Sequence, residues 1–212
     1  GFVVAAPDHE GNTLFDGLAE AGLPLNSDTL AIRGQDMVDV LDFLISGQAG
    51  VDIDPSRIGA MGHSFGAVTT GWLLQQDGRP VAGMAMAAPM DNPLLPGVDI
   101  EALAQPLFFL LAQEDNSITE LGNELIRGNH DEAASSILVE VPDAGHWSFS
   151  DVVGLHEPFD PGCGQGQRQT DGEPFSYLPA DQGRQIARET ASAFFQGWLM
   201  DQPFGLEWLA LR

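Results

Sequence analysis

Ser64, in the pentapeptide GHSFG at residues 62–66, is the feature that most constrains the fold of this 212-residue chain. A short apolar stretch, residues 57–61, runs directly into the pentapeptide, and a stretch with helical spacing of apolar residues, 67–76, leaves it. A serine at such a strand-to-helix turn needs small neighbours two positions away, because the backbone passes close by on both sides. The pattern predicts a nucleophile elbow, in which the serine hydroxyl projects above the carboxyl end of a buried parallel strand.

A serine hydroxyl is a poor nucleophile alone, so this interpretation requires a histidine base and an orienting carboxylate, in the chain order serine, acid, histidine. The apolar run 106–112 is typical of a buried strand and is followed closely by Asp115. The next predicted strand, 136–141, is followed by His146. Because the carboxyl ends of parallel strands meet at one edge of a sheet, we predict that Asp115 orients His146 and that His146 activates Ser64.

Two other carboxylates are alternatives for the orienting role. Asp91 follows a strand predicted over 81–87, and Glu114 adjoins Asp115. The position after the 106–112 run best matches the required chain order, which favours Asp115. The remaining histidines are the alternatives for the base: His9, His63, His130 and His156. Their spacing matches no pattern of metal ligands, so we expect neither a metal nor a cofactor.

Three residues beside the predicted catalytic groups are expected to contact the substrate. The backbone N–H of Phe65 follows the serine and is the expected donor to the oxyanion. His63 precedes the serine and Trp147 follows the base, so we predict that both line the substrate site. By the geometry of an elbow, the His63 ring points away from the position of the base.

Three ordered motifs carry a family resemblance: GFVVAAPDHEGNT at the start, GHSFG in the middle and DAGHWSFSD around residue 146. Together they resemble two kinds of bacterial α/β-hydrolase, the dienelactone hydrolase-like and the platelet-activating-factor acetylhydrolase-like serine esterases. The resemblance runs along most of the chain. The resemblance implies an α/β-hydrolase fold, with a mostly parallel sheet and helices on both faces. Dienelactone hydrolases proper use a cysteine where this chain has Ser64, so their lactone chemistry does not carry over. The acetylhydrolases place their acid after the strand that ends here near Ala87, where this chain has alanine, so Asp115 is retained.

The resemblance also implies what precedes the elbow. In this fold the elbow follows the fifth strand, and FVVAAP at residues 2–7 looks like the fourth. We therefore expect residues 1–212 to be one domain and a piece of a longer protein, without the first three strands and without a second oxyanion donor. We also expect an open gap in the sheet beside the strand at 57–61.

Composition excludes several classes of protein. The chain has 31 acidic residues, eight arginines and no lysine, a net charge of −23, which disfavours binding to nucleic acids and anionic lipids. Such a balance fits a secreted or periplasmic bacterial protein, adaptation to high salt, or the compositional bias of a GC-rich genome. No apolar stretch approaches the roughly 18 residues that a membrane span needs. The single cysteine, Cys163, has no partner for a disulfide within the chain and is expected to be a passive thiol or to pair outside it.

The segment 147–179 is about 33 residues long and rich in Gly, Pro and Asp, with aromatic anchors, so we predict a loop that covers the substrate pocket. A closing helix over 180–200 carries an apolar stripe that should pack on the sheet. We predict a serine carboxylic-ester hydrolase that forms an acyl-enzyme on a small-molecule ester. The alternatives are an acyltransferase or peptidase on the same residues, or a hydrolase-fold module that binds without catalysis.

Overall fold

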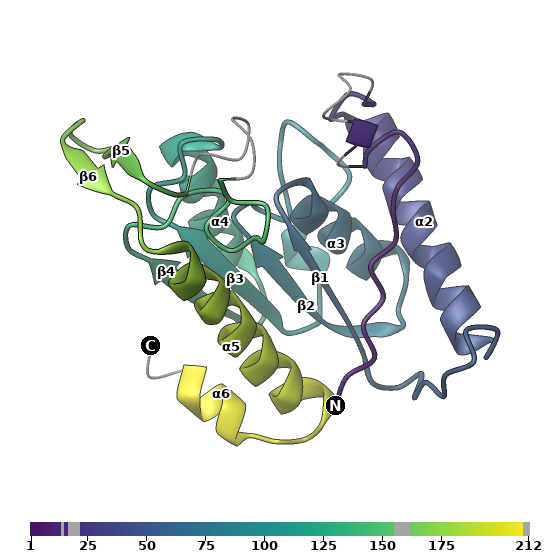
Figure 1. Ribbon diagram of the computed structural model, residues 1–212. Coiled ribbons are helices and arrows are strands. Elements are labelled where there is room, and N and C mark those ends of the chain that lie inside the picture. Colours follow the sequence, from purple (N-terminus) through teal and green to yellow (C-terminus); the bar gives the residue numbers. More distant parts are fainter. Residues whose placement is uncertain (14, 17–21, 155–161, 210–212) are drawn as a thin grey trace.

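Four parallel strands form the central sheet of the computed structural model (Figure 1). The structure describes all residues except 14, 17–21, 155–161 and 210–212. The strands lie in the order β1-β2-β3-β4. Their bounds are Ile58–His63 for β1, Pro80–Met86 for β2, Leu107–Ala112 for β3 and Ser136–Val141 for β4. Each strand predicted from the elbow onward is confirmed, with its ends shifted by no more than two residues.

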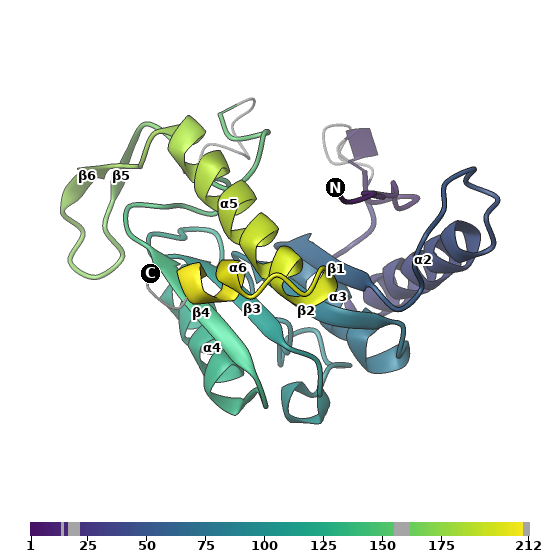
Figure 2. The same ribbon diagram turned by 90° about the horizontal axis from the view of Figure 1, so that it is seen from below.

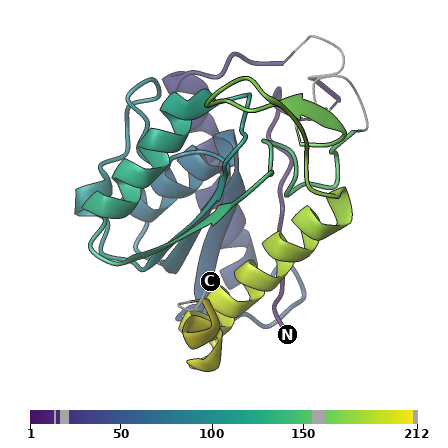
Figure 3. The same ribbon diagram turned by 90° about the vertical axis from the view of Figure 1, so that its left-hand side faces the viewer.

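Helices cover both faces of this sheet, as predicted. Helix α3 (Phe65–Gln76) packs on β1 and β2, α4 (Thr119–Glu132) packs on β3 and β4, and the long α2 (Ser27–Ile45) packs against α3. Helices α5 (Ala180–Leu199) and α6 (Phe204–Leu209) cover the other face, as the view from below shows (Figure 2). In Figure 3 the sheet stands between the α3 and α4 layer and the green and yellow α5 and α6 layer.

Strand β3 shows why the sequence of a central strand of this sheet is a continuous apolar run. All six of its residues are buried, because helices cover both of its faces. Phe108 and Leu110 face α5, where the Phe108 ring lies 5.5 Å from the ring of Phe194. Leu107 and Phe109 face the opposite layer with residues of α3 and the short helix η1 (Ile100–Ala102). The two half-cores fix the strand register, since a slip by one residue would exchange the two sets of side chains.

The segment FVVAAP does not form the predicted strand. Residues 1–9 have no regular secondary structure in the described chain, and the side chains of Val3 and Val4 are 55% and 82% exposed. A strand forms only when its backbone groups find a neighbouring ladder, and among the described residues β1 pairs with β2 alone. The β propensity of the segment is therefore not expressed, and β1 is an edge of the sheet among the described residues.

The segment 147–179 contains structure that its sequence did not predict. Strands β5 (Gln165–Gln167) and β6 (Pro174–Ser176) form a small antiparallel hairpin at its far end. Helices α2 and α6 were likewise not anticipated. His156 and Phe159 lie outside the described residues. None of the described helices combines the length and apolarity that crossing a bilayer requires.

Candidate active site

Ser64 occupies a strained turn between β1 and α3. Its φ of 55° and ψ of −123° are unusual for a residue with a side chain, and its N–H donates to the carbonyl of Met86 at the end of β2 (3.0 Å). A Cβ on Gly62 would lie 2.0 Å from the carbonyl oxygen of Gly66, so only glycine fits there. A Cβ on Gly66 would meet only Arg33 Nη2, at 4.0 Å, so close backbone contact explains the first glycine of the motif and not the second.

A chain of hydrogen bonds joins Ser64 to a buried carboxylate. Ser64 Oγ lies 2.8 Å from Nε2 of His146, and Nδ1 of His146 lies 2.7 Å from Oδ2 of Asp115. Both His146 and Asp115 are buried, with 3% and 0% of their surface exposed. The other carboxylate oxygen of Asp115 accepts backbone N–H groups from Ser117 and Ile118 at 3.0 and 3.1 Å. With Nδ1–H donating to the carboxylate, Nε2 is free to accept the serine proton.

The two alternative carboxylates lie elsewhere. Glu114 Oε1 accepts from Nη1 of Arg168 (2.8 Å) and its Oε2 from the Gln169 N–H (2.9 Å), so its side chain turns to the hairpin of β5 and β6. Asp91 Oδ2 accepts the backbone N–H of Ile100 (3.3 Å). Neither forms a hydrogen bond with His146 in the described structure.

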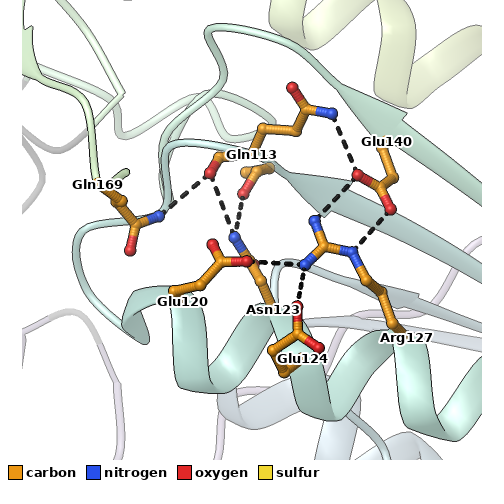
Figure 4. A network of polar contacts seen from close by, with 8 residues as sticks. Gln113, Glu120, Asn123, Glu124, Arg127, Glu140 and Gln169 are labelled. Atoms are coloured by element: carbon orange, nitrogen blue, oxygen red, sulfur yellow. Dashed lines mark hydrogen bonds and ion pairs between the residues drawn. The ribbon is translucent and has the colours of Figure 1, made fainter. Parts of the chain in front are cut away.

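A polar network anchors the loop that carries Asp115 (Figure 4). Asn123 of α4 donates to the carbonyls of Ala112 and Gln113, at 3.1 and 3.3 Å, and Gln169 donates to the Gln113 carbonyl from the other side (3.1 Å). The Gln113 side chain reaches Glu140 of β4 (3.1 Å). Arg127 completes the network through ion pairs with three carboxylates, those of Glu120, Glu124 and Glu140. The loop after β3 is thus tied to α4, β4 and the hairpin.

The prediction that the His63 ring points away from the base is wrong, because His63 contacts the backbone of His146. Its Nε2 lies 2.6 Å from the His146 carbonyl oxygen, so this nitrogen carries a proton and donates. The His63 ring lies 4.9 Å from the ring of His146 and 4.9 Å from that of Trp147, centroid to centroid. Burial, followed by the proximity of His146, lowers the pKa of His63 from 6.5 to about 4. His63 is therefore neutral at neutral pH and supports the segment that presents His146.

The other described histidines are not part of the hydrogen-bonded series of Ser64, His146 and Asp115. His9 is buried and its Nδ1 pairs with Asp36 Oδ2 at 2.7 Å. His130, in the last turn of α4, contacts the Ser136 hydroxyl at 2.6 Å. Cys163 is a free, partly buried thiol. Within the described residues, no group of three or more His, Cys, Asp or Glu side chains is arranged to hold a metal ion.

Two further features concern the surroundings of the elbow. The N–H groups of Phe65 and Gly66, in the first turn of α3, have no hydrogen-bond partner among the described residues, which leaves them available to an anion. On the α5 side, a pocket of about 440 Å³ is lined by Met61, Met86 and Phe149 and by charged residues of α5, and neither Ser64 nor His146 is among its lining residues. Sequence reasoning did not identify Met86 as a residue next to the serine, because strand pairing places it there.

Known proteins resemble this chain in sequence over its first part and in structure over most of its length. The prolyl oligopeptidase family (Peptidase_S9) matches residues 1–95, which include the elbow but neither Asp115 nor His146. A ferulic acid esterase from Streptomyces cinnamoneus is similar in structure, with a TM-score of 0.67 and 21% sequence identity over 89% of this chain and 54% of the esterase. The chain thus spans about half the length of that enzyme. A search of curated proteins finds no significant match.

Two further solved structures share the architecture. The dienelactone hydrolase-like promiscuous phosphotriesterase P91 from metagenomic libraries has a TM-score of 0.56 at 14% identity, over 81% of this chain and 62% of P91. The AtxE2 isopeptidase has a TM-score of 0.53 at 20% identity, over 82% of this chain and 26% of the isopeptidase. At these identities the likeness concerns the fold. Parallel strands, helices on both faces, a serine at the strand-to-helix turn and these structural neighbours agree, and the chain has the α/β-hydrolase fold.

Proposed function

We propose that this protein is a serine carboxylic-ester hydrolase that works through an acyl-enzyme. The observation that carries the proposal is the hydrogen-bonded series Ser64, His146 and Asp115, with distances of 2.8 and 2.7 Å. Nucleophile, base and orienting acid within hydrogen-bond reach of one another are the arrangement that activates a serine hydroxyl.

Acylation begins when Ser64 Oγ attacks the ester carbonyl carbon while Nε2 of His146 takes the hydroxyl proton. The carbonyl oxygen becomes an oxyanion, which the Phe65 N–H stabilises by a hydrogen bond. The tetrahedral intermediate collapses, the C–O bond to the alcohol breaks, and His146 returns its proton to the leaving oxygen. Water then attacks the acyl-serine with the same base, which releases the acid and restores Ser64.

Asp115 would keep the His146 ring in the productive tautomer. Its Oδ2 accepts from Nδ1, and two backbone N–H groups hold the other oxygen in place. A carboxylate fixed in this way also stabilises the imidazolium that forms in each half-reaction.

The substrate would be a small-molecule ester bound against Trp147 and beside His63. The His146 and Trp147 rings meet edge to face, with centroids 5.0 Å apart, so the indole borders the reacting groups. The segment 147–179 would cover this region and decide which esters enter.

A peptidase on the same residues is the second candidate, and the match of residues 1–95 to the prolyl oligopeptidase family favours it. Amide and ester cleavage use the same acyl-enzyme, so the substrate must distinguish them. Short para-nitrophenyl esters and para-nitroanilides with the same acyl groups form a matched panel. We expect turnover of the esters to exceed that of the anilides.

Labelling by a fluorophosphonate tests the proposal directly. The intact protein should react covalently at Ser64 and should hydrolyse para-nitrophenyl esters, and Ser64→Ala should lose the label and most of the rate. Ser150→Ala, a serine of the following segment, is the matched control and should keep both. An unlabelled wild-type protein that still binds esters would instead indicate a non-catalytic binding module.

A further inference from the structure

Arg33 of α2 reaches the start of α3, next to the elbow. Its guanidinium carbon lies 5.0 Å from the centre of the Phe65 ring, and its Nη2 lies 4.0 Å from the place where a Cβ on Gly66 would be. Nε donates to the Thr69 hydroxyl (3.1 Å) and Nη1 donates to the Asn12 side-chain oxygen. An arginine has five N–H donors, so three of them have no partner among the described residues.

Arg33 also has no carboxylate partner in the described structure, although acidic residues outnumber basic ones by 31 to 8. Its neighbour Asp36 is hydrogen-bonded to His9. Most of the other described arginines do form ion pairs with carboxylates: Arg57, Arg79, Arg127, Arg168 and Arg184. Burial lowers the pKa of Arg33 from its usual value, and the charge of Asp36 opposes this only in part.

No carboxylate forms an ion pair with this partly buried cation among the described residues, and an anion bound there would offset the cost of its burial. The first turn of α3 adds the free N–H groups of Phe65 and Gly66 and the positive end of the helix dipole. A guanidinium and two free N–H groups thus lie beside the elbow in a chain whose net charge is −23. A planar guanidinium with free N–H groups matches a carboxylate in geometry and charge.

We propose that Arg33 binds a carboxylate of the substrate, and that the preferred substrates are esters that carry a carboxylate near the ester bond that is cleaved. This inference rests on the proposed ester hydrolysis and names its substrate class. The Nη2 atom lies close to Gly66, two residues after Ser64, so the carboxylate and the reacting carbonyl would belong to one small molecule. Arg33 then acts as a specificity-determining residue and not in the chemical steps.

Two pairs of esters test the proposal and separate the two places where the carboxylate can be. In para-acetoxybenzoate and para-acetoxybenzamide the alcohol part carries either a carboxylate or a neutral amide. In monomethyl glutarate and the methyl ester of glutaramic acid, the acyl part carries either the carboxylate or a neutral amide. The measured quantity is the ratio of kcat/KM for the anionic ester to that for its neutral partner, because this ratio cancels general losses of activity.

In Arg33→Gln this ratio should fall about 10- to 100-fold for at least one pair, the effect of losing one charge-assisted hydrogen-bonded contact. Arg57→Gln is the matched control, since it removes the same charge at the amino end of β1, and it should change the ratio less than about twofold. An unchanged ratio in Arg33→Gln, or an equal fall in Arg57→Gln, overturns the proposal.

A binding measurement on the wild-type protein tests the proposal even if Arg33→Gln does not fold or the protein hydrolyses none of these esters. Titration of the wild-type protein with para-hydroxybenzoate should shift the NMR amide signals of Phe65 and Gly66, whereas para-hydroxybenzamide should shift them at least about tenfold less at equal concentration. Equal shifts refute the role of Arg33. Binding of the carboxylate without hydrolysis of any ester would contradict the proposed function and leave the anion site intact.

Discussion

The pH dependence of stability is expected to depend strongly on His63. Its ring lies against the rings of His146 and Trp147, and its Nε2–H donates to the His146 carbonyl. Protonation would place a charge in this partly buried stack beside another histidine, opposed by the hydrogen bond to the His146 backbone and by the Asp115 carboxylate. Glutamine has an N–H group that can replace Nε2–H and does not titrate, so His63→Gln isolates the effect of the ring's charge.

The magnitude follows from the difference in proton binding between the two states. In the folded protein the pKa of His63 is about 4, and in the unfolded chain it returns to 6.5. As the pH falls below 6.5 the unfolded chain takes up a proton that the folded protein does not, so stability present above that pH is lost toward pH 4. Linkage gives a loss of about 2 kcal/mol between pH 7 and pH 5, with a slope that reaches about 1.2 kcal/mol per pH unit.

Urea unfolding of the intact protein at a series of pH values measures this difference. The free energy of unfolding of wild type should fall about 2 kcal/mol more than that of His63→Gln over this range. Ser64→Ala keeps the His63 ring and should follow the wild-type slope. Parallel curves for wild type and His63→Gln would refute the reasoning, as would an NMR titration of His63 with a midpoint near its ordinary value.

Two further predictions concern the elbow and the acid. Gly62→Ala places a methyl group 2.0 Å from the Gly66 carbonyl oxygen and should abolish ester hydrolysis and lower Tm, whereas Gly78→Ala, where nothing lies within 4 Å of the new methyl, should leave both near wild type. Asp115→Asn should lower kcat by about 10⁴ because an amide favours the wrong imidazole tautomer, and Asp91→Asn should cost little. Reversed effects of the two asparagine variants, measured with para-nitrophenyl acetate, would reassign the orienting acid.

The sequence was sufficient to predict which residues would meet. Ser64, Asp115 and His146 each follow a strand with a clear apolar pattern, and parallel strands bring their carboxyl ends to one edge. Local signals and this single rule of topology bring residues separated by 31 and 82 positions within hydrogen-bond distance. The α/β class, the strand limits and helix α3 were predictable for the same reason.

Features that depend on a distant partner were not predictable. FVVAAP has the composition of a strand, but a strand also requires a neighbouring ladder, and composition does not say whether one is present. Arg33 gives no signal in the sequence, because its contacts to Asn12 and Thr69 join residues 21 and 36 positions away. The His63 ring was predicted to line the substrate site, while its hydrogen bond to the His146 backbone becomes visible only once the loop after β4 is placed.

The adjacent acids Glu114 and Asp115 illustrate why chain position alone cannot assign a role. Asp115 accepts from His146, whereas Glu114 pairs with Arg168, which also reaches Asp143 at 2.8 Å. Glu114 lies in the loop after β3 and Asp143 in the loop after β4, so one guanidinium bridges the two loops that carry Asp115 and His146. A hydrogen bond of 2.7 Å between side chains on separate loops persists only if the loops hold a fixed separation, and this bridge supplies a constraint of that kind. The hairpin of β5 and β6 therefore joins the site from outside the sheet, through the acid that does not contact His146.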